Sequence, residues 1–243
     1  MGLDNVKVVS FSGIDGAGKS TQIESLQCSL RELGKRHMLF TFWDNVVVFP
    51  GLREHMSLKA FKGDKGIGSP EKPITRRDKN VTSWYVVAAR LFLYLLDAYS
   101  LRVAISGSYA EGADFIIFDR YIYDELANLP LHNRFVAVYV RLISMIVPKP
   151  DIAFVVDAEP EAAHSRKPEY PLEFVRRNRE SYLCISRLIS RITVLPPDSV
   201  EATSAKINDS VARVCLIPHT ELRDLRLTCP AVHGPCESKS SNA

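Results

Sequence analysis

The chain has 243 residues, of which 46% are hydrophobic and 24% are charged. That length suits one large domain or two small ones, and that composition excludes a globally disordered chain and a coiled coil. Lys and Arg together number 31 against 28 Asp and Glu, which leaves a net charge of +3. A protein that lives by nonspecific nucleic-acid binding usually carries a larger basic excess, so we expect no nucleic-acid partner.

The cysteines and the apolar stretches indicate the cellular compartment in which the protein works. Five cysteines, an odd number, are scattered along the chain, and the first residues lead into a strand-like segment without a secretory leader. No stretch reaches the ~20 uninterrupted apolar residues of a membrane-spanning helix. We therefore expect a protein of the reducing cytoplasm that has no membrane partner.

Hydrophobic patterning predicts strands that alternate with helices. An apolar run over 6–11, helical spacing over 20–33 and a second apolar run over 37–43 form a strand–helix–strand unit, which implies a parallel sheet. We predict one α/β domain over residues 1–216 and a loosely ordered tail over 217–243. The later predicted strands are 115–118, 152–156 and 192–195, and the later predicted helices are 52–61, 81–104, 131–147, 159–167, 171–190 and 200–214.

A glycine-rich loop with a lysine directly follows the first predicted strand. Residues 13–20 read Gly-Ile-Asp-Gly-Ala-Gly-Lys-Ser and fit the pattern G-x-x-x-x-G-K-[ST]. Glycines let the backbone wrap around phosphate oxygens, Lys19 reaches the β- and γ-phosphates, and Ser20 offers its hydroxyl to Mg²⁺. Because the motif ends a strand and opens a helix, it predicts a bound nucleoside triphosphate. The predicted nucleotide-binding residues are Gly13, Asp15, Gly16, Ala17, Gly18, Lys19, Ser20 and Thr21.

A second candidate group, Asp-Arg-Tyr at 119–121, directly follows the third predicted strand. In an open parallel sheet, the carboxyl end of this strand lies beside the phosphate-binding loop. Asp119 there either holds a Mg²⁺-bound water or caps the next helix, and the pattern alone leaves both open. The planar guanidinium of Arg120 suits a phosphate group.

Residues 11–21, the Asp-Arg-Tyr segment and a basic stretch near residue 166 together resemble the thymidylate kinases, which are nucleoside monophosphate kinases among the P-loop proteins. The resemblance runs over residues 5–216. It implies a three-layer P-loop NTPase fold with a five-stranded parallel sheet flanked by helices and a short lid near 164–171. It also implies ATP and Mg²⁺ as cofactors, and phosphoryl transfer from ATP to a nucleoside monophosphate, dTMP to dTDP, in nucleotide biosynthesis.

The same resemblance implies roles on the acceptor side. Asp15 would approach the sugar of the acceptor, and Arg90, in the helix predicted over 81–104, would hold the acceptor's phosphate. Tyr121 would lie near the sugar. Asp124 would contact the substrate, at a position where the family usually has Ser.

On the phosphoryl-transfer side, the resemblance implies four catalytic residues and a metal residue. Lys19 and Arg120 would contact the phosphates that are joined. Arg166 and Lys167 would bring positive charge from the lid as water is excluded. Asp119 would support Mg²⁺. The alternative for the two lid residues is a solvated, charged helix face.

Three departures from the family's pattern fall on the acceptor side. The Arg-Glu-Pro-Gly segment after the second strand is absent, Val86 replaces the aromatic that stacks on thymine, and Leu129 replaces the base-reading Gln. Trp43 and Asp44 end the second predicted strand, either as an aromatic wall and an acceptor-sensing carboxylate or as a core Trp and a turn-forming Asp. Base-stacking and base-reading side chains decide which acceptor a kinase selects, and two of them are replaced here. Two alternatives therefore stay open: a P-loop kinase for a deoxynucleoside or sugar-like metabolite, and a nucleotide-binding regulator with weak hydrolysis.

Two segments bear on partners besides the small-molecule nucleotide substrate. Segment 52–79 holds eight Lys or Arg against four acidic residues, either to grip an anionic acceptor or, as we favour, as a solvated loop. Thymidylate kinases pair through helices, so the resemblance implies a homodimer. The apolar helix predicted over 81–104 suits such an interface, and burial inside the monomer accounts for its character equally well.

Overall fold

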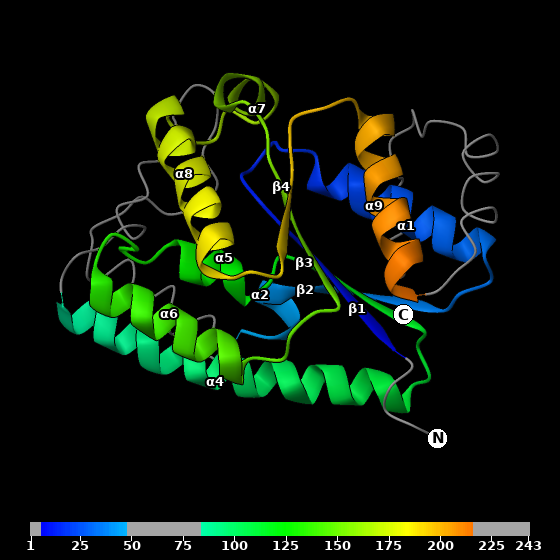
Figure 1. Cartoon of the computed structure of the whole chain (residues 1–243), viewed down its shortest axis with the longest axis horizontal. Coiled ribbons are helices and arrows are strands. Elements are labelled where there is room, and N and C mark those ends of the chain that lie inside the picture. The colour runs from blue at the N-terminus through cyan, green and yellow to red at the C-terminus, as the bar shows by residue number, and fades with distance from the viewer. Residues whose placement is uncertain (1–5, 48–83, 216–243) are drawn as a thin grey trace, which may run out of the picture.

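The structure, a computed structural model, describes residues 6–47 and 84–215. Its strands are β1 (Lys7–Ser12), β2 (His37–Thr41), β3 (Phe115–Asp119), β4 (Ile152–Val156) and β5 (Ile192–Leu195). In this part of the chain they form one parallel sheet in the order β2-β3-β1-β4-β5 (Figure 1). The predicted α/β class with a five-stranded parallel sheet flanked by helices is therefore confirmed.

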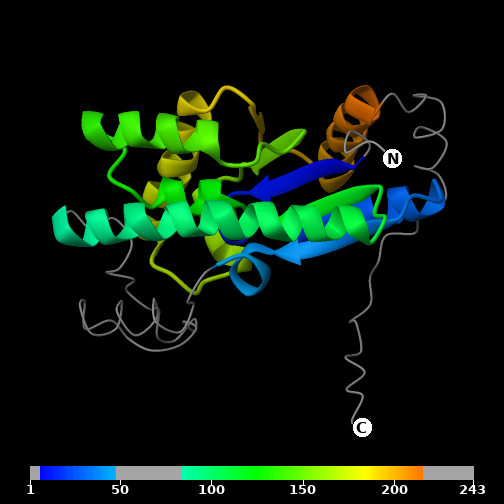
Figure 2. The same ribbon diagram turned by 90° about the horizontal axis from the view of Figure 1, so that it is seen from below.

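Helices lie on both sides of this sheet. They are α1 (Lys19–Glu32), α2 (Phe42–Asn45), α4 (Trp84–Ala110), α5 (Ile122–Ala127), α6 (Arg134–Ile146), α7 (Pro160–Arg166), α8 (Leu172–Leu188) and α9 (Val200–Cys215). α1 packs against α9, while α5, α6 and α7 all pack against α8. α4 and α6 run side by side (Figures 1 and 2), joined by a 2.6 Å hydrogen bond from the Tyr139 hydroxyl to the Leu91 carbonyl.

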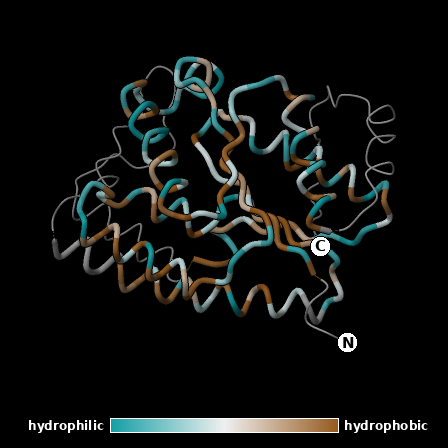
Figure 3. Tube along the Cα trace, viewed as in Figure 1, coloured by the Kyte–Doolittle hydropathy of each residue, from teal (hydrophilic) through white to brown (hydrophobic). Residues whose placement is uncertain are grey.

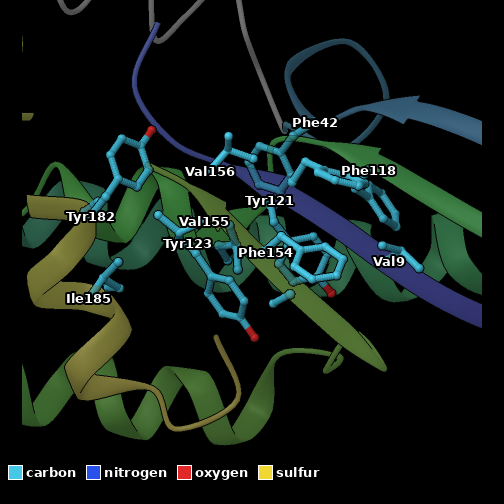
Figure 4. Close-up of a cluster of buried hydrophobic side chains, with 14 of the residues drawn as sticks. Val9, Phe42, Phe118, Tyr121, Tyr123, Phe154, Val155, Val156, Tyr182 and Ile185 are labelled. Atoms are coloured by element: carbon cyan, nitrogen blue, oxygen red, sulfur yellow. The ribbon is translucent and has the colours of Figure 1, made fainter. Parts of the chain in front are cut away.

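The core lies at the central strands, where hydrophobic residues concentrate (Figure 3). β4 is an unbroken run of buried apolar residues, as expected for a strand that is covered by helices on both faces. Aromatic rings extend this core toward the carboxyl ends of the strands (Figure 4). The ring centroids of Phe11 and Phe154 are 5.4 Å apart, and those of Phe118 and Tyr121 are 5.3 Å apart.

The sheet register brings four strand ends to one level. Phe11 of β1 pairs with Asp119 of β3 and with Phe154 of β4, and Thr41 of β2 also pairs with Asp119. The segments that follow these strands therefore meet at one edge of the sheet. In open parallel sheets this edge is where ligands bind.

Three elements differ from the sequence prediction. The second strand ends at Thr41, because 42–45 turn into the short helix α2. The long helix continues to Ala110. The short helix α5 was not predicted, because six residues show too little periodicity. In the structure, Asp124 stabilises the first turn of α5 by accepting the Tyr121 N–H at 3.0 Å. The predicted helix 52–61, the basic segment 52–79 and the tail 217–243 lie outside the described residues.

Within the described ranges, no helix combines the length and the apolar character that crossing a membrane requires.

Candidate active site

The loop after β1 forms a tight cradle between the end of β4 and α7. Gly13 has φ of 139°, and a Cβ added to it would lie 2.4 Å from the Val156 carbonyl oxygen. Gly16 has φ of 82°, and its added Cβ would lie 2.3 Å from the Ala163 carbonyl oxygen. Both contacts are to backbone, which cannot move aside as a flexible side chain would. Glycine is thus required at both positions for the loop to lie against its neighbours.

Lys19 lies inside this cradle and is 8% exposed. Its Nζ donates to the carbonyls of Gly13 at 3.0 Å and Ile14 at 2.9 Å. Burial and the neighbouring guanidinium of Arg120 lower the pKa of Lys19 to about 8. The Lys19 ammonium is therefore charged at neutral pH. The two loop carbonyls that accept its hydrogen bonds carry no net charge and offset its positive charge only weakly.

Arg120 follows β3 in a left-handed backbone conformation, with φ of 69°. Its N–H donates to the Phe11 carbonyl at 2.9 Å. The guanidinium bridges two carboxylates: Nη2 pairs with Asp15 of the cradle, and Nη1 lies 3.4 Å from Asp124 Oδ1. Burial opposes the charge, but Tyr182 and the carboxylates of Asp124 and Asp15 raise the pKa of Arg120 above its ordinary value. Arg120 is a fixed cation beside the cradle.

Ser20 and Asp119 are the residues that fit a magnesium ion. Ser20 is exposed in the first turn of α1, next to Thr21. Asp119 is half-buried, and its carboxylate makes no hydrogen bond or ion pair with any side chain that the structure describes, while its charge acts on Lys19 and Arg120. Side chains alone form no cluster of three or more His, Cys, Asp or Glu in these ranges. Mg²⁺ suits this sparse set, since it usually keeps waters and takes further ligands from phosphates.

The lid residues Arg166 and Lys167 stand at the end of α7. Arg166 Nε donates to the Ala162 carbonyl at 3.1 Å, and Nη1 lies 4.0 Å from the place that a Cβ on Gly18 would take. Arg166 has no ion pair with any residue that the structure describes. Lys167, in contrast, pairs with Glu169 at 3.4 Å. The structure thus brings the charge of Arg166, rather than that of Lys167, beside the cradle.

Tyr121 does not border the site. Its side chain is 0% exposed, and its hydroxyl donates to the Pro148 carbonyl at 2.6 Å. The predicted contact with an acceptor's sugar is therefore wrong, because the ring is part of the core. Tyr121 is also the N-cap residue of α5, which excludes the capping role considered for Asp119.

Asp124 does not offer a free carboxylate to a substrate. It is 4% exposed and accepts hydrogen bonds on both oxygens. Its donors are the Ser12 hydroxyl at 2.5 Å, the Tyr121 N–H at 3.0 Å, the Tyr182 hydroxyl at 2.7 Å and Arg120 Nη1 at 3.4 Å. The predicted direct contact of Asp124 with a substrate is wrong, because these donors already occupy both carboxylate oxygens. Asp124 forms an ion pair with Arg120 instead.

The remaining predicted acceptor-side residues belong to α2, to α4 and to the segment after α5. Trp43 and Asp44 are exposed in α2, and Trp43 is 39% exposed, which rules out a core tryptophan. Arg90 belongs to α4, but its side chain lies outside the described part of the structure. Leu129, which stands in the position of a base-reading Gln, is 2% exposed.

Sequence reasoning missed two contributions from α8. Tyr182 reaches Asp124 across 58 residues of sequence. Arg179 binds both oxygens of Asp157, at 2.7 Å and 2.8 Å, and so ties α8 to the end of β4. No local pattern distinguishes these side chains from others on a solvated helix, because each contact depends on the tertiary fold.

Comparisons with known proteins bear on the fold. No protein-family model matches the chain. Among solved structures, the chain is similar to a thymidylate kinase from Ehrlichia chaffeensis, with a TM-score of 0.52 and 16% identity, over 86% of this chain and 99% of that one. The chain has a P-loop NTPase fold. The cradle after β1 is formed by the residues that the motif G-x-x-x-x-G-K-[ST] predicts to be a phosphate-binding loop, with Lys19 as its lysine.

Nucleotide affinity should fall as the pH rises through the pKa of Lys19. In the free protein this ammonium loses its proton around pH 8, whereas bound phosphates favour the charged form. We expect the Kd for Mg·ATP to be flat below pH 7 and to rise about tenfold per pH unit above pH 9, with proton uptake on binding near pH 8.5. Isothermal titration calorimetry in two buffers of different ionisation enthalpy measures both quantities.

The matched variant is Lys19→Met, which keeps a long side chain and removes the titrating group. It should bind Mg·ATP weakly, with no proton uptake near pH 8.5. If Lys19→Met takes up as many protons on binding as the wild-type protein does, the titrating group is a residue other than Lys19.

One added methyl group tests the contact between the cradle and α7. In Gly16→Ala, the Cβ would meet the Ala163 carbonyl at 2.3 Å, so α7 must move away. We expect a loss of about 1–3 kcal/mol in the free energy of unfolding and a nucleotide affinity at least about tenfold lower, from chemical denaturation and ligand titration. Gly34→Ala is the control, because Gly34 has φ of 65° and no atom within 4 Å. Equal losses of nucleotide affinity in both variants would contradict the contact.

Proposed function

We propose that the chain transfers the γ-phosphoryl group of Mg·ATP to a nucleoside monophosphate, with dTMP as the first candidate. The observation that carries this proposal is the fixed guanidinium of Arg120 beside the ammonium of Lys19. A nucleotide-binding switch needs only the cradle and a movable loop. A second, partly buried cation that two carboxylates hold in place is suited to a site that brings two phosphate groups together.

The chemistry follows from position and charge. An acceptor phosphate is itself a nucleophile, so the site needs no strong general base; it needs the two phosphates held in line and their repulsion reduced. Lys19 and Arg120 supply fixed positive charge there, and Arg166 adds a cation from α7. Mg²⁺, when it is held by Ser20 and through water by Asp119, would neutralise further phosphate charge.

A different small acceptor is the second candidate, and buried side chains on the acceptor side favour it. Leu129 and Tyr121 stand where the resemblance places base- and sugar-contacting groups, and both are buried. Asp44 is an exposed carboxylate at the same edge of the sheet. A hydroxyl acceptor, such as a deoxynucleoside or a sugar-like metabolite, requires a base of this kind.

An acceptor panel tests the proposal. ADP release from Mg·ATP is coupled to an indicator reaction in the presence of dTMP, dUMP, other monophosphates, thymidine or buffer alone. We expect turnover with one or more monophosphates, greatest with dTMP, and a loss of at least about 10³-fold in Lys19→Ala, which lacks the charge in the cradle. Turnover with thymidine alone would replace the proposal with the hydroxyl-acceptor candidate. ADP release that is independent of any acceptor would indicate a nucleotide-hydrolysing regulator.

We also propose that the chain pairs with a second copy through α4 and α6. Each helix exposes an apolar stripe at helical spacing, and the two helices are neighbours. The side chains, 43–79% exposed, are Phe92, Leu95, Tyr99 and Val103 on α4, and Phe135, Val138, Leu142, Met145 and Ile146 on α6. Together they expose on the order of 1,000 Å², about what each partner buries in a stable interface. A two-fold axis would place two such surfaces face to face as a four-helix contact.

Light scattering after size-exclusion chromatography tests this pairing. Wild-type protein should elute with the mass of two chains, and Leu142→Glu should elute with the mass of one, because a charge at the contact is left unpaired. Val214→Glu places the same charge at an exposed valine of α9, outside the two stripes, and should leave the dimer intact. A wild-type monomer at micromolar concentration would refute the pairing.

A further inference from the structure

The carboxylate of Asp124 occupies an unusual place next to the candidate active site. It belongs to α5, is almost fully buried, and accepts hydrogen bonds on both oxygens. Oδ2 receives the Ser12 hydroxyl and the Tyr121 N–H, while Oδ1 receives the Tyr182 hydroxyl and faces Arg120. Asp124 is the third residue of α5 rather than its N-cap, and most of its partners lie outside that helix. The carboxylate therefore links α5 to β1, to α8 and to Arg120, besides supporting the start of the helix.

The two carboxylates that flank Arg120 are not equivalent. The Asp15 side chain is 18% exposed in the cradle, where an incoming ligand can replace it as the partner of the guanidinium. The Asp124 side chain is 4% exposed and is fixed by its other donors. When Arg120 turns toward a phosphate, Asp124 is the partner that can stay in place. It is thus the anchor of the guanidinium, and Asp15 is the exchangeable partner.

Tyr182 sets the orientation of this anchor. It comes from α8, is buried, and its hydroxyl donates to Oδ1 at 2.7 Å, the same oxygen that faces Arg120. Figure 4 shows the ring extending from α8 with its hydroxyl pointing away from the helix. α8 is itself held to the end of β4 by Arg179 and Asp157. The position of Arg120 thus depends on a helix that does not contribute to the cradle.

We infer that Asp124 and Tyr182 are positioning residues for Arg120: the hydroxyl of Tyr182 fixes the Asp124 carboxylate, and the carboxylate holds the guanidinium beside the cradle. This inference rests on the proposed function, in which Arg120 acts on the transferring phosphoryl group. No atom of Asp124 or Tyr182 needs to touch a substrate. Their removal should affect the rate of phosphoryl transfer more than the binding of ATP.

The first test separates kcat from nucleotide affinity. Tyr182→Phe removes one hydroxyl and keeps the ring, so we expect kcat to fall about 10- to 100-fold with the Kd for Mg·ATP within about threefold of wild type. Tyr123→Phe is the matched control: Tyr123 is also buried, lies on α5 itself, and its hydroxyl makes no hydrogen bond to a residue of the described ranges. Its kcat should be unchanged. Equal losses of kcat in both variants would overturn the inference.

A double-mutant cycle tests whether Tyr182 acts through Arg120. In the Arg120→Lys background the guanidinium is gone, so Tyr182→Phe should cause less than about a threefold further loss of kcat. The full single-variant loss in that background would show that the two side chains act independently, which overturns the inference.

Nitrogen NMR supplies a readout that needs no activity. A guanidinium held between two carboxylates rotates slowly, so its Nη nitrogens should give separate signals, assigned by their absence in Arg120→Lys. We expect these signals to merge in Tyr182→Phe and in Asp124→Asn, and to persist in Tyr123→Phe. Persistence in Tyr182→Phe would overturn the positioning role. If wild-type protein phosphorylates no acceptor yet shows this pattern, the proposed function fails while the positioning of Arg120 stands.

Discussion

The guanidinium of Arg120, held between Asp15 and Asp124, is the interaction on which the candidate site depends. Three charged groups in a partly buried place are costly unless each has a partner. Here the cradle after β1 supplies one carboxylate, α5 supplies the other, and β3 ends at the residue just before the cation. The left-handed backbone of Arg120 is a second cost that the same contacts offset. Three separate chain segments are therefore fixed relative to one another by one ion-pair network.

The same network explains the state of Lys19. A buried ammonium beside a fixed guanidinium favours its neutral form, and the three nearby carboxylates only partly oppose that effect. The loop carbonyls that receive its protons are weak partners compared with phosphate oxygens. Lys19 is thus the cation with weak partners in this network, whereas Arg120 is already paired with Asp15 and Asp124. Phosphate oxygens would compensate the Lys19 ammonium better than the loop carbonyls do, which supports the proposed binding of a nucleoside triphosphate.

The sequence predicted the parts of the fold that backbone geometry dictates, and missed those that side-chain direction decides. Glycines at 13 and 16 meet backbone atoms of β4 and α7, so their pattern could be recognised without the structure. The segment Asp-Arg-Tyr predicted Arg120 beside the cradle, where its guanidinium pairs with Asp15, and its contact with phosphates stays a prediction. The same segment predicted Tyr121 near the acceptor's sugar, whereas its ring is fully buried in the core. The link from Tyr182 to Asp124 joins α8 to α5 across 58 residues of sequence, and no local periodicity encodes it.

This division also separates the two halves of the candidate function. The donor half is built on loop geometry that the P-loop NTPase fold carries even at 16% identity to a solved relative. The proposed acceptor half would depend on side chains from α2, α4 and the segment after α5, where a single replacement changes which ligand fits. At Leu129 an apolar, buried side chain stands where base recognition requires an exposed amide. The choice of acceptor must therefore come from other groups at that edge, among which Trp43 presents an exposed ring and Asp44 an exposed carboxylate. An aromatic surface beside a carboxylate suits a ligand with a flat ring and a hydroxyl group, a requirement that deoxynucleotides and deoxynucleosides both meet.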